Sequence, residues 1–144
     1  MDKSKYREDE IVEKKLPTFY DYYDYRKDFN NVYEPSDDTF LLTDVLGLER
    51  EFINKKSNII SVEVGVGSGY VSTYFIDKYN EKISKHYCVD INKDALDLTK
   101  RIMDKMNFTN FELVESNLFK NVSEKFDIII FNPVYYSNLA LCDY

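Results

Sequence analysis

The chain has 144 residues, of which 44% are hydrophobic and 31% charged, and its formal net charge at pH 7 is −7. This length and this balance are typical of a single globular domain in water, and no stretch approaches the roughly 18 consecutive apolar residues of a membrane-spanning helix. The excess of acidic residues argues against a protein that binds nucleic acid, because affinity for the phosphate backbone requires clustered Lys and Arg.

Few residues are available for metal or disulfide chemistry. The cysteines are Cys88 and Cys142, and the one histidine is His86. These residues have neither the spacing of a disulfide framework nor that of a zinc site, so no metal site is predicted. His86 stands at the entry to an apolar run and is interpreted as a strand-edge residue rather than as a catalytic base.

The N-terminal sequence MDKSKYREDE lacks the apolar core of a secretory signal and is too acidic for a transit peptide. We therefore expect a cytoplasmic protein, with the nucleus as a further compartment. Residues 1–30 mix charges with the tract YDYYDYRKDF, which shows neither strand alternation nor a helical stripe. They are interpreted as a flexible N-terminal extension, with a docking segment for a partner as the alternative. The folded domain is expected over residues 31–144.

The first element expected in this domain is an α-helix from about residue 37 to 48. Pro35 disfavours helix in the residue before it, and the Ser36 side chain can cap the helix. The carboxylates of Asp37 and Asp38 suit the positive end of a helix dipole. The apolar face that we expect to point inward consists of Phe40, Leu41, Val45 and Leu48.

Strands and helices are then expected to alternate to the end of the chain. Strand patterns, rich in β-branched residues, occur at 58–64, 86–91, 111–116 and 126–131. Helical spacing of apolar residues occurs at 70–79 and 93–106. Such alternation produces βαβ units and a parallel sheet covered on both sides. The predicted fold class is α/β.

A glycine-rich sequence, EVGVGSGY, lies between the first expected strand and the next helix, where a turn can hold a nucleotide-like ligand. Gly65, Gly67 and Gly69 read G-x-G-x-G and not the G-x-G-x-x-G of a dinucleotide site. Glu63 would repel a phosphate but suits a ligand that carries an ammonium and a sulfonium. Asp90 ends the second strand, where its carboxylate can accept hydrogen bonds from two ribose hydroxyls.

These two features together predict an S-adenosylmethionine site. The alternatives are plain structural roles: an ordinary strand-to-helix turn for the glycines, and the N-cap of the following helix for Asp90.

The fourth strand ends in the sequence FNPVYY, and its carboxyl end should open on the same crevice as the glycine loop. A planar NH2 group is a poor nucleophile, because its lone pair is delocalised. The Asn132 side-chain oxygen and the Pro133 carbonyl could each accept one N–H of such a group and orient it for methyl transfer. The Tyr135 ring could stack on the flat substrate. The alternative is a turn that merely ends the strand.

Four motifs, VYEPSDDTFLL, EVGVGSG, DIN and FNPVY, occur in this order and resemble those of class I S-adenosylmethionine-dependent methyltransferases. The last is similar to the Asn-Pro-Pro-Tyr motif of the branch that methylates amino groups. The set most resembles the HemK-related eukaryotic glutamine N5-methyltransferases of peptide-chain release factors, once labelled DNA adenine methylases. The resemblance implies a Rossmann-like, doubly wound parallel sheet, here incomplete, with about four of seven strands.

The resemblance also implies roles for individual residues. Asn132, Pro133 and Tyr135 would be catalytic and hold the substrate amide. The cofactor-binding residues would be Thr39, Glu63, Gly65, Gly67, Gly69, Asp90, Ile91, Asn117, Leu118 and Asn132.

Partners follow from the same resemblance. Members of this branch form a heterodimer with a small zinc-binding activator subunit, which adds a strand at the edge of the sheet occupied here by FELVES. The substrate would be a release factor. Methylation of a protein lysine or of a nucleobase amine is the alternative, and a catalytically impaired cofactor-binding module is another.

Three features of the chain depart from the family pattern. Val134 replaces the second proline of the corner, and Asn117 replaces an aspartate near the adenine. The third is that the strand pattern stops after the fourth strand, which would leave DIIIF as an exposed apolar edge.

Overall fold

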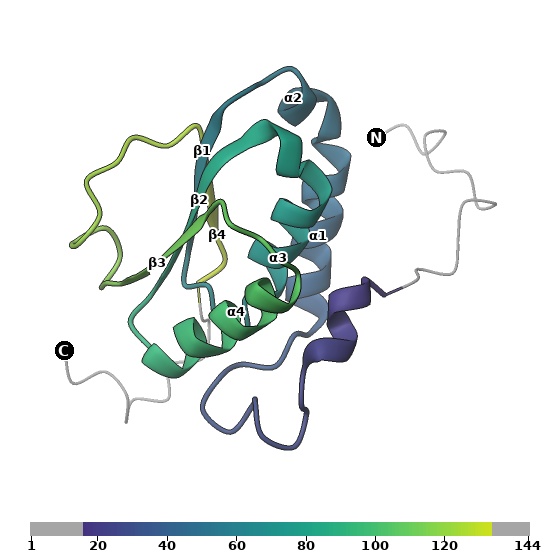
Figure 1. Ribbon diagram of the computed structural model, residues 1–144, viewed down its shortest axis with the longest axis vertical. Coiled ribbons are helices and arrows are strands. Elements are labelled where there is room, and N and C mark those ends of the chain that lie inside the picture. The colour runs from purple at the N-terminus through teal and green to yellow at the C-terminus, as the bar shows by residue number, and fades with distance from the viewer. Residues whose placement is uncertain (1–15, 134–144) are drawn as a thin grey trace, which may run out of the picture.

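The computed structural model describes residues 16–133, and residues 1–15 and 134–144 lie outside this range. Its centre is a parallel sheet with the strand order β3-β2-β1-β4 (Figure 1). The strands are β1 (Ile59–Val64), β2 (Ile83–Asp90), β3 (Phe111–Glu115) and β4 (Ile128–Phe131). The predicted α/β class and the parallel sheet are confirmed.

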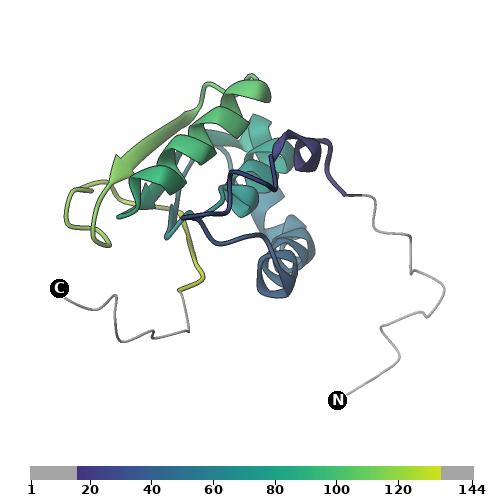
Figure 2. The same ribbon diagram turned by 90° about the horizontal axis from the view of Figure 1, so that it is seen from below.

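The helices are α1 (Asp37–Leu48), α2 (Arg50–Asn54), α3 (Tyr70–Tyr79) and α4 (Lys93–Lys105), with short 3₁₀ helices η3 (Thr18–Tyr22) and η4 (Asn80–Lys82). Figures 1 and 2 show α1, α3 and α4 on one side of the sheet and the connection from β3 to β4 on the other. Within the described part of the chain, that connection contains no helix. The expectation of a sheet covered on both faces is met by helices on one face and by this loop on the other.

Each face of the sheet has its own apolar core. On the helix side, Phe75, Ile76 and Met103 are fully buried together with inward residues of β1 and β2. On the opposite side, Val62 and Val89 are buried beneath Phe126 and other residues of the loop. The two cores hold β1 and β2 rigidly, so the loops that leave their carboxyl ends start from fixed points.

Helix α1 has the predicted bounds, but the predicted inward face was wrong for three of its four residues. Phe40 is partly buried and packs edge-on against Tyr70 of α3 as expected. Leu41, Val45 and Leu48 are 65%, 42% and 75% exposed, whereas Thr43 and Leu46 of the same helix are buried. The orientation of α1 is set by its contact with α3, where the Tyr79 hydroxyl donates to the carbonyl of Leu46 at 2.6 Å. A stripe of apolar residues in the sequence does not show which side of a helix its neighbour will cover.

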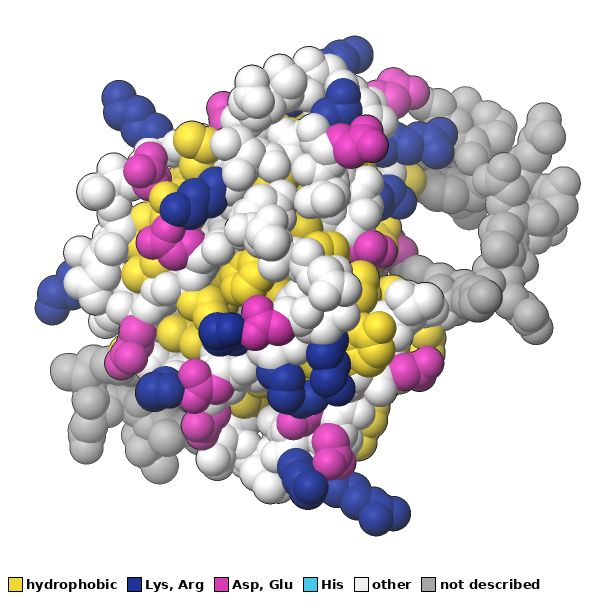
Figure 3. Space-filling view, in the orientation of Figure 1, with side chains coloured by type: hydrophobic (Ala, Val, Ile, Leu, Met, Phe, Trp, Pro, Cys, Tyr) yellow, Lys and Arg dark blue, Asp and Glu magenta, His cyan; other side chains and the backbone are white. Residues whose placement is uncertain are grey.

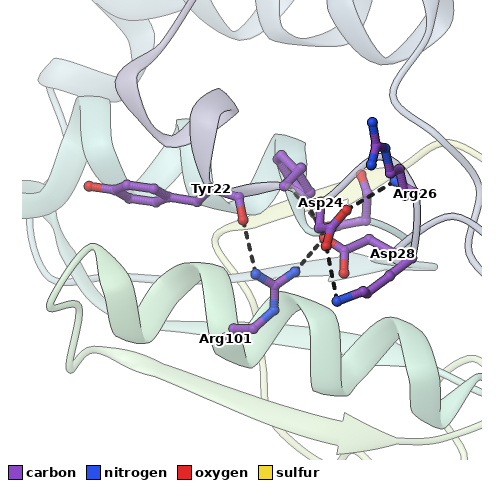
Figure 4. A network of polar contacts seen from close by, with 8 residues as sticks. Tyr22, Asp24, Arg26, Asp28 and Arg101 are labelled. Atoms are coloured by element: carbon purple, nitrogen blue, oxygen red, sulfur yellow. Dashed lines mark hydrogen bonds and ion pairs between the residues drawn. The ribbon is translucent and has the colours of Figure 1, made fainter.

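The expectation of a flexible extension is corrected for residues 16–30. Phe19 is fully buried and Tyr23 is 6% exposed, packed against α3 and α4. Arg101 of α4 points toward this segment, donates to the Tyr22 carbonyl at 2.9 Å and forms an ion pair with Asp28 (Figure 4). The aromatic rings of this segment pack against one another and against Tyr70 of α3, so their order along the chain follows neither a helical nor a strand period.

The end of the sheet matches the sequence prediction. Within residues 16–133, β4 pairs only with β1, and Ile129 and Phe131 are 56% and 54% exposed while Ile130 is buried. The expected exposed apolar edge is therefore present. No helix in the described residues has both the length and the apolar character needed to span a membrane.

Candidate functional site

A cavity of about 630 Å³ opens at the carboxyl ends of β1, β2 and β4. In an open parallel sheet this is the place where connections diverge and ligands bind. The predicted site residues that line the cavity are Thr39, Glu63, Gly65, Gly67, Asp90, Ile91, Asn117, Leu118, Asn132 and Pro133. Gly69 lies against α4, and Tyr135 falls outside the described residues. Thus the structure brings together residues from four separate motifs.

The glycine loop turns sharply from β1 into α3. Its three glycines all have positive φ, which is strained for other residues. A Cβ on Gly69 would lie 2.5 Å from the Thr99 hydroxyl oxygen of α4, so the close approach of loop and helix requires glycine there. A Cβ on Gly67 would meet no atom within 4 Å, because this part of the loop borders open space. The loop therefore presents bare backbone to the cavity.

Asp90, at the end of β2, is held by the backbone on both of its carboxylate oxygens. The amide of Gly67 donates to Oδ2 and the amide of Asn92 donates to Oδ1, each at 2.9 Å. The N-cap of α4 is Asn92, whose side chain accepts from the Asp94 amide, so the alternative N-cap role for Asp90 was wrong. Because each carboxylate oxygen has a second lone pair, Asp90 can still accept hydrogen bonds from a ligand.

Glu63 is the buried acid of the site and ends a chain of polar side chains that lies between the sheet and α3. Its carboxylate accepts from the Ser72 hydroxyl, and both Ser72 and Ser61 lie 2.8 Å from ring nitrogens of His86. An ionised carboxylate only accepts, so with Glu63 ionised His86 Nε2 donates to Ser72 and the Ser61 hydroxyl donates to Nδ1. Every polar group in this chain then has a partner.

Burial decides the protonation of this chain. Burial raises the pKa of Glu63, and the negative charge of Asp90 adds to this effect. Hydrogen bonds from Ser72 lower the pKa, and the net value is about 8. Burial also lowers the pKa of His86 to about 3, so its ring is neutral at physiological pH. His86 lies within β2 and is fully buried, which corrects its interpretation as a strand-edge residue.

The corner after β4 meets the start of α1. The Asn132 amide donates from Nδ2 to Oδ2 of Asp38 at 2.8 Å, although 94 positions separate the two residues. Pro133 follows on the cavity wall. The first motif, near residue 36, and the corner at residue 132 therefore form one wall of the site.

Residues at the rim are apolar. Ile91 and Leu118 are 49% and 55% exposed beside the cavity, and the backbone of Leu118 has a φ of 50°. Asn117 follows the carboxyl end of β3 by two residues and also lines the cavity. Such a rim suits a flat, partly apolar ligand group.

The charge of the site is negative. Asp37, Asp38, Glu63 and Asp90 line the cavity, and no Lys or Arg does so among residues 16–133. Elsewhere, on the face shown in Figure 3, Lys and Arg side chains are interspersed with Asp and Glu rather than gathered into a basic patch. The cavity therefore favours a cationic ligand over a phosphate.

The sequence prediction missed three groups of residues around the site. Asp38 was assigned only to the helix dipole, and the roles of Ser72 and Ser61 were not predicted. The Tyr23 hydroxyl, from the segment expected to be flexible, donates to the carbonyl of Ser68 in the glycine loop at 3.0 Å. The position of Asp38 within the motif YEPSDDTF was a usable signal, whereas the other contacts depend on packing between distant segments.

Residues 43–142 of the chain match the family model of the methyltransferase small domain. The chain belongs to the methyltransferase small domain family. This finding confirms the resemblance inferred from the four motifs.

Several known methyltransferases are similar to this chain over most of its length. The protein MJ0928 of Methanocaldococcus jannaschii, named for protein N5-glutamine methylation, is 39% identical over 72% of this chain and 47% of its own. Human methyltransferase HEMK2 is 35% identical over 74% of this chain and 50% of its own. The eRF1 methyltransferase catalytic subunit mtq2 of Schizosaccharomyces pombe is 30% identical, with coverages of 76% and 52%. The chain thus spans about half the length of these relatives.

Solved methyltransferases share the fold. A ribosomal protein L11 methylase from Lactobacillus delbrueckii subsp. bulgaricus superimposes with a TM-score of 0.57 at 20% identity, over 72% of this chain and 50% of its own. Streptococcus mutans SMU.1697c, solved in complex with SAH, gives a TM-score of 0.51 at 22% identity, over 67% and 55%. Residues 16–133 therefore form a Rossmann-like methyltransferase fold with a four-stranded sheet.

Proposed function

We propose that this chain is the cofactor-binding part of an S-adenosylmethionine-dependent methyltransferase that acts on the side-chain amide of a release-factor glutamine. One observation carries the proposal: the glycine loop with Asp90 and the Asn132-Pro133 corner line the same cavity. A ligand held at Asp90 and a substrate held at Asn132 would therefore meet.

The residues present fit this cofactor. Gly67 leaves open space where a ligand can approach the backbone, and Asp90 is oriented to accept from ribose hydroxyls. Glu63 is buried, and no Lys or Arg among residues 16–133 lines the cavity beside it, so the ammonium and sulfonium charges of the ligand would stabilise its carboxylate form. Thr39, Ile91, Asn117 and Leu118 would hold the remainder. When bound, the cofactor supplies a methyl group on a positively charged sulfur.

The corner would prepare the substrate nitrogen. The Asn132 oxygen and the Pro133 carbonyl would each accept one N–H of the glutamine NH2 and so fix the direction of its lone pair. Tyr135 would stack on the planar amide. This mechanism consists of orientation and electrostatic stabilisation, and the chain's own residues form no covalent intermediate.

The names of the relatives support this substrate. Two are named for methylation of a glutamine or of the release factor eRF1, and a release factor glutamine methyltransferase of Streptococcus pneumoniae is 33% identical over 58% of this chain. Because the chain spans about half of the first three relatives, its own turnover must be measured directly.

We also propose a heterodimer with a small zinc-binding activator subunit in the cytoplasm. In the described residues, β3 pairs only with β2, so its outer edge can accept a further strand. Phe111 and Leu113 on β3 are only partly buried. Size-exclusion chromatography of the two proteins together tests this assembly.

The decisive experiment measures transfer of a labelled methyl group from S-adenosylmethionine. A release factor, a histone and duplex DNA are offered in parallel, each with and without the activator subunit. We expect label on the release-factor glutamine alone. Label on histone lysine or on adenine would replace the proposed substrate, and calorimetric cofactor binding without any transfer would support an impaired module.

The Asn132→Ala variant separates binding from transfer. It should bind S-adenosylmethionine within about threefold of the wild-type affinity but lose transfer by at least about 100-fold, because only the reacting nitrogen loses its acceptor. A loss of cofactor affinity equal to the loss of transfer would contradict the assignment of Asn132 to the substrate.

A further inference from the structure

The Asn132 side chain is held by a carboxylate from the other end of the described chain. Asp38 is the second residue of α1, and its Oδ2 accepts from Asn132 Nδ2 at 2.8 Å. Both side chains are part-buried and line the cavity. The contact lies at the point where the proposed function needs an accurately placed amide.

The Asp38 carboxylate is itself anchored at the start of α1. Its Oδ1 accepts from the Ser36 hydroxyl at 2.8 Å, and the Tyr33 hydroxyl lies 2.6 Å from that of Ser36 and 3.4 Å from Oδ1. The Ser36 amide also donates to the Thr39 hydroxyl at 3.2 Å. One carboxylate oxygen is therefore tied to the helix terminus, and the other is directed at Asn132.

Asp38 is ionised at neutral pH. Burial raises the pKa of its carboxyl group, but hydrogen bonds from Asn132, Ser36 and nearby backbone amides outweigh this effect and hold the pKa below its usual range. A carboxylate has no hydrogen to donate, so the end of the Asn132 amide beside it must be the NH2 group.

This chemistry distinguishes two orientations that have almost the same shape. An asparagine amide can rotate so that its oxygen and nitrogen exchange places, and sterics alone barely separate the two states. With the nitrogen held by Asp38, the Asn132 oxygen is turned the other way. In the flipped state an NH2 group would face the NH2 of the substrate, two donors would oppose each other, and the substrate nitrogen would lose an acceptor.

We propose that Asp38 is a positioning residue that fixes the orientation of the Asn132 amide, with Ser36 and Tyr33 holding its carboxylate. The role in transfer rests on the proposed function, whereas the orientation itself does not. The motif that begins α1 thus contributes to the chemistry at the carboxyl end of β4.

The orientation can be tested by NMR without turnover. In protein labelled with ¹⁵N at asparagine side chains, the Asn132 NH2 signals are identified by their absence in Asn132→Ala. Asp38→Ala should shift these signals and speed their exchange with water, because a charge-assisted hydrogen bond is lost. Asp38→Asn, of equal size, should also disturb them, because its own amide can present either end. The matched control Asp37→Asn removes one charge from the same helix turn and should leave them in place.

Kinetics test the consequence. Asp38→Ala should lower kcat for methyl transfer about 10- to 100-fold, the range expected when a reacting group is misplaced. The cofactor Kd should stay within about twofold of the wild-type value, and the urea midpoint should stay close to that of Asp37→Asn. If Asp38 had only a structural role, both the Kd and the midpoint would change.

Unchanged Asn132 signals in Asp38→Ala would overturn the proposal, and so would a rise in cofactor Kd as large as the fall in kcat. A wild-type chain that transfers no methyl to a release factor, even with the activator subunit, would overturn the proposed function and the role of Asp38 in transfer. The NMR result would still decide whether Asp38 orients the amide, so the two failures are distinguishable.

Discussion

The titration of Glu63 should make cofactor binding depend on pH. With a pKa of about 8, the free protein carries Glu63 mostly protonated at pH 6, whereas a ligand with ammonium and sulfonium charges favours the ionised form. The cofactor must therefore displace a proton at low pH, and its affinity should rise with pH and level off above about 8.

The size of this effect follows from the ionised fraction. For a pKa of about 8, roughly 1% of Glu63 is ionised at pH 6 and half at pH 8, so the affinity should increase about 50-fold between these two pH values. Calorimetry with S-adenosylmethionine at pH 6, 7 and 8 measures this change. Glu63→Gln keeps the shape of the side chain but cannot ionise. The pH dependence of its affinity in the same buffers therefore reports any titration of the ligand itself, which is subtracted from the wild-type result.

The same shift predicts a pH effect on stability with the opposite sign. The pKa of Glu63 is higher in the folded protein, about 8, than the ordinary 4.5, so folding favours the neutral acid. The resulting stability is complete below about pH 4.5 and is lost as pH rises through 8, by roughly 3 to 5 kcal/mol. Urea unfolding of Glu63→Gln should show a much smaller loss. The reasoning is refuted if wild type and Glu63→Gln show parallel pH profiles in both experiments.

Three further substitutions test other parts of the site. Asp90→Ala should weaken S-adenosylmethionine binding at least about 30-fold, as expected for lost hydrogen bonds to a charged acceptor, and equal affinity by calorimetry would refute the ribose assignment. Gly69→Ala should lower the free energy of unfolding by about 2 to 5 kcal/mol, because φ is +76° and the new Cβ would overlap Thr99. Urea denaturation measures this loss, and adding Thr99→Gly should restore part of it. Tyr23→Phe should lower the free energy of unfolding by about 1 to 2 kcal/mol, because the buried carbonyl of Ser68 loses its donor. An unchanged urea midpoint would show that this contact does not stabilise the glycine loop.

Local chemistry explains why much of the site was visible in the sequence. The bounds of α1 follow from Pro35 and Ser36, which act on the adjacent backbone, and the observed helix begins at the predicted residue. Gly65 and Gly67 mark a turn that few other residues can form. Asp90 is the last residue of the strand run HYCVD, so the alternation of strands and helices was enough to place it at the carboxyl edge of the sheet.

Other features required knowledge of what packs against what. The Asp38–Asn132 hydrogen bond joins residues 94 positions apart, and nothing in either local sequence indicates the other as its partner. The burial of Phe19 and Tyr23 depends on contacts with Tyr70 of α3 and with Leu98 and Ile102 of α4, all of them distant in the sequence.

The sequence alone determined the order of the elements, the parallel sheet and the residues at its carboxyl edge, because strand period, helix caps and glycine turns act over a few neighbouring positions. The tertiary structure alone decided which face of α1 is buried, that the His86 ring lies between the sheet and α3 with Ser61 and Ser72 as partners, and that Asp38 orients toward Asn132. These outcomes depend on contacts between distant segments, whose free energy is set by the packed surfaces and by desolvation, and neither quantity can be read from local sequence.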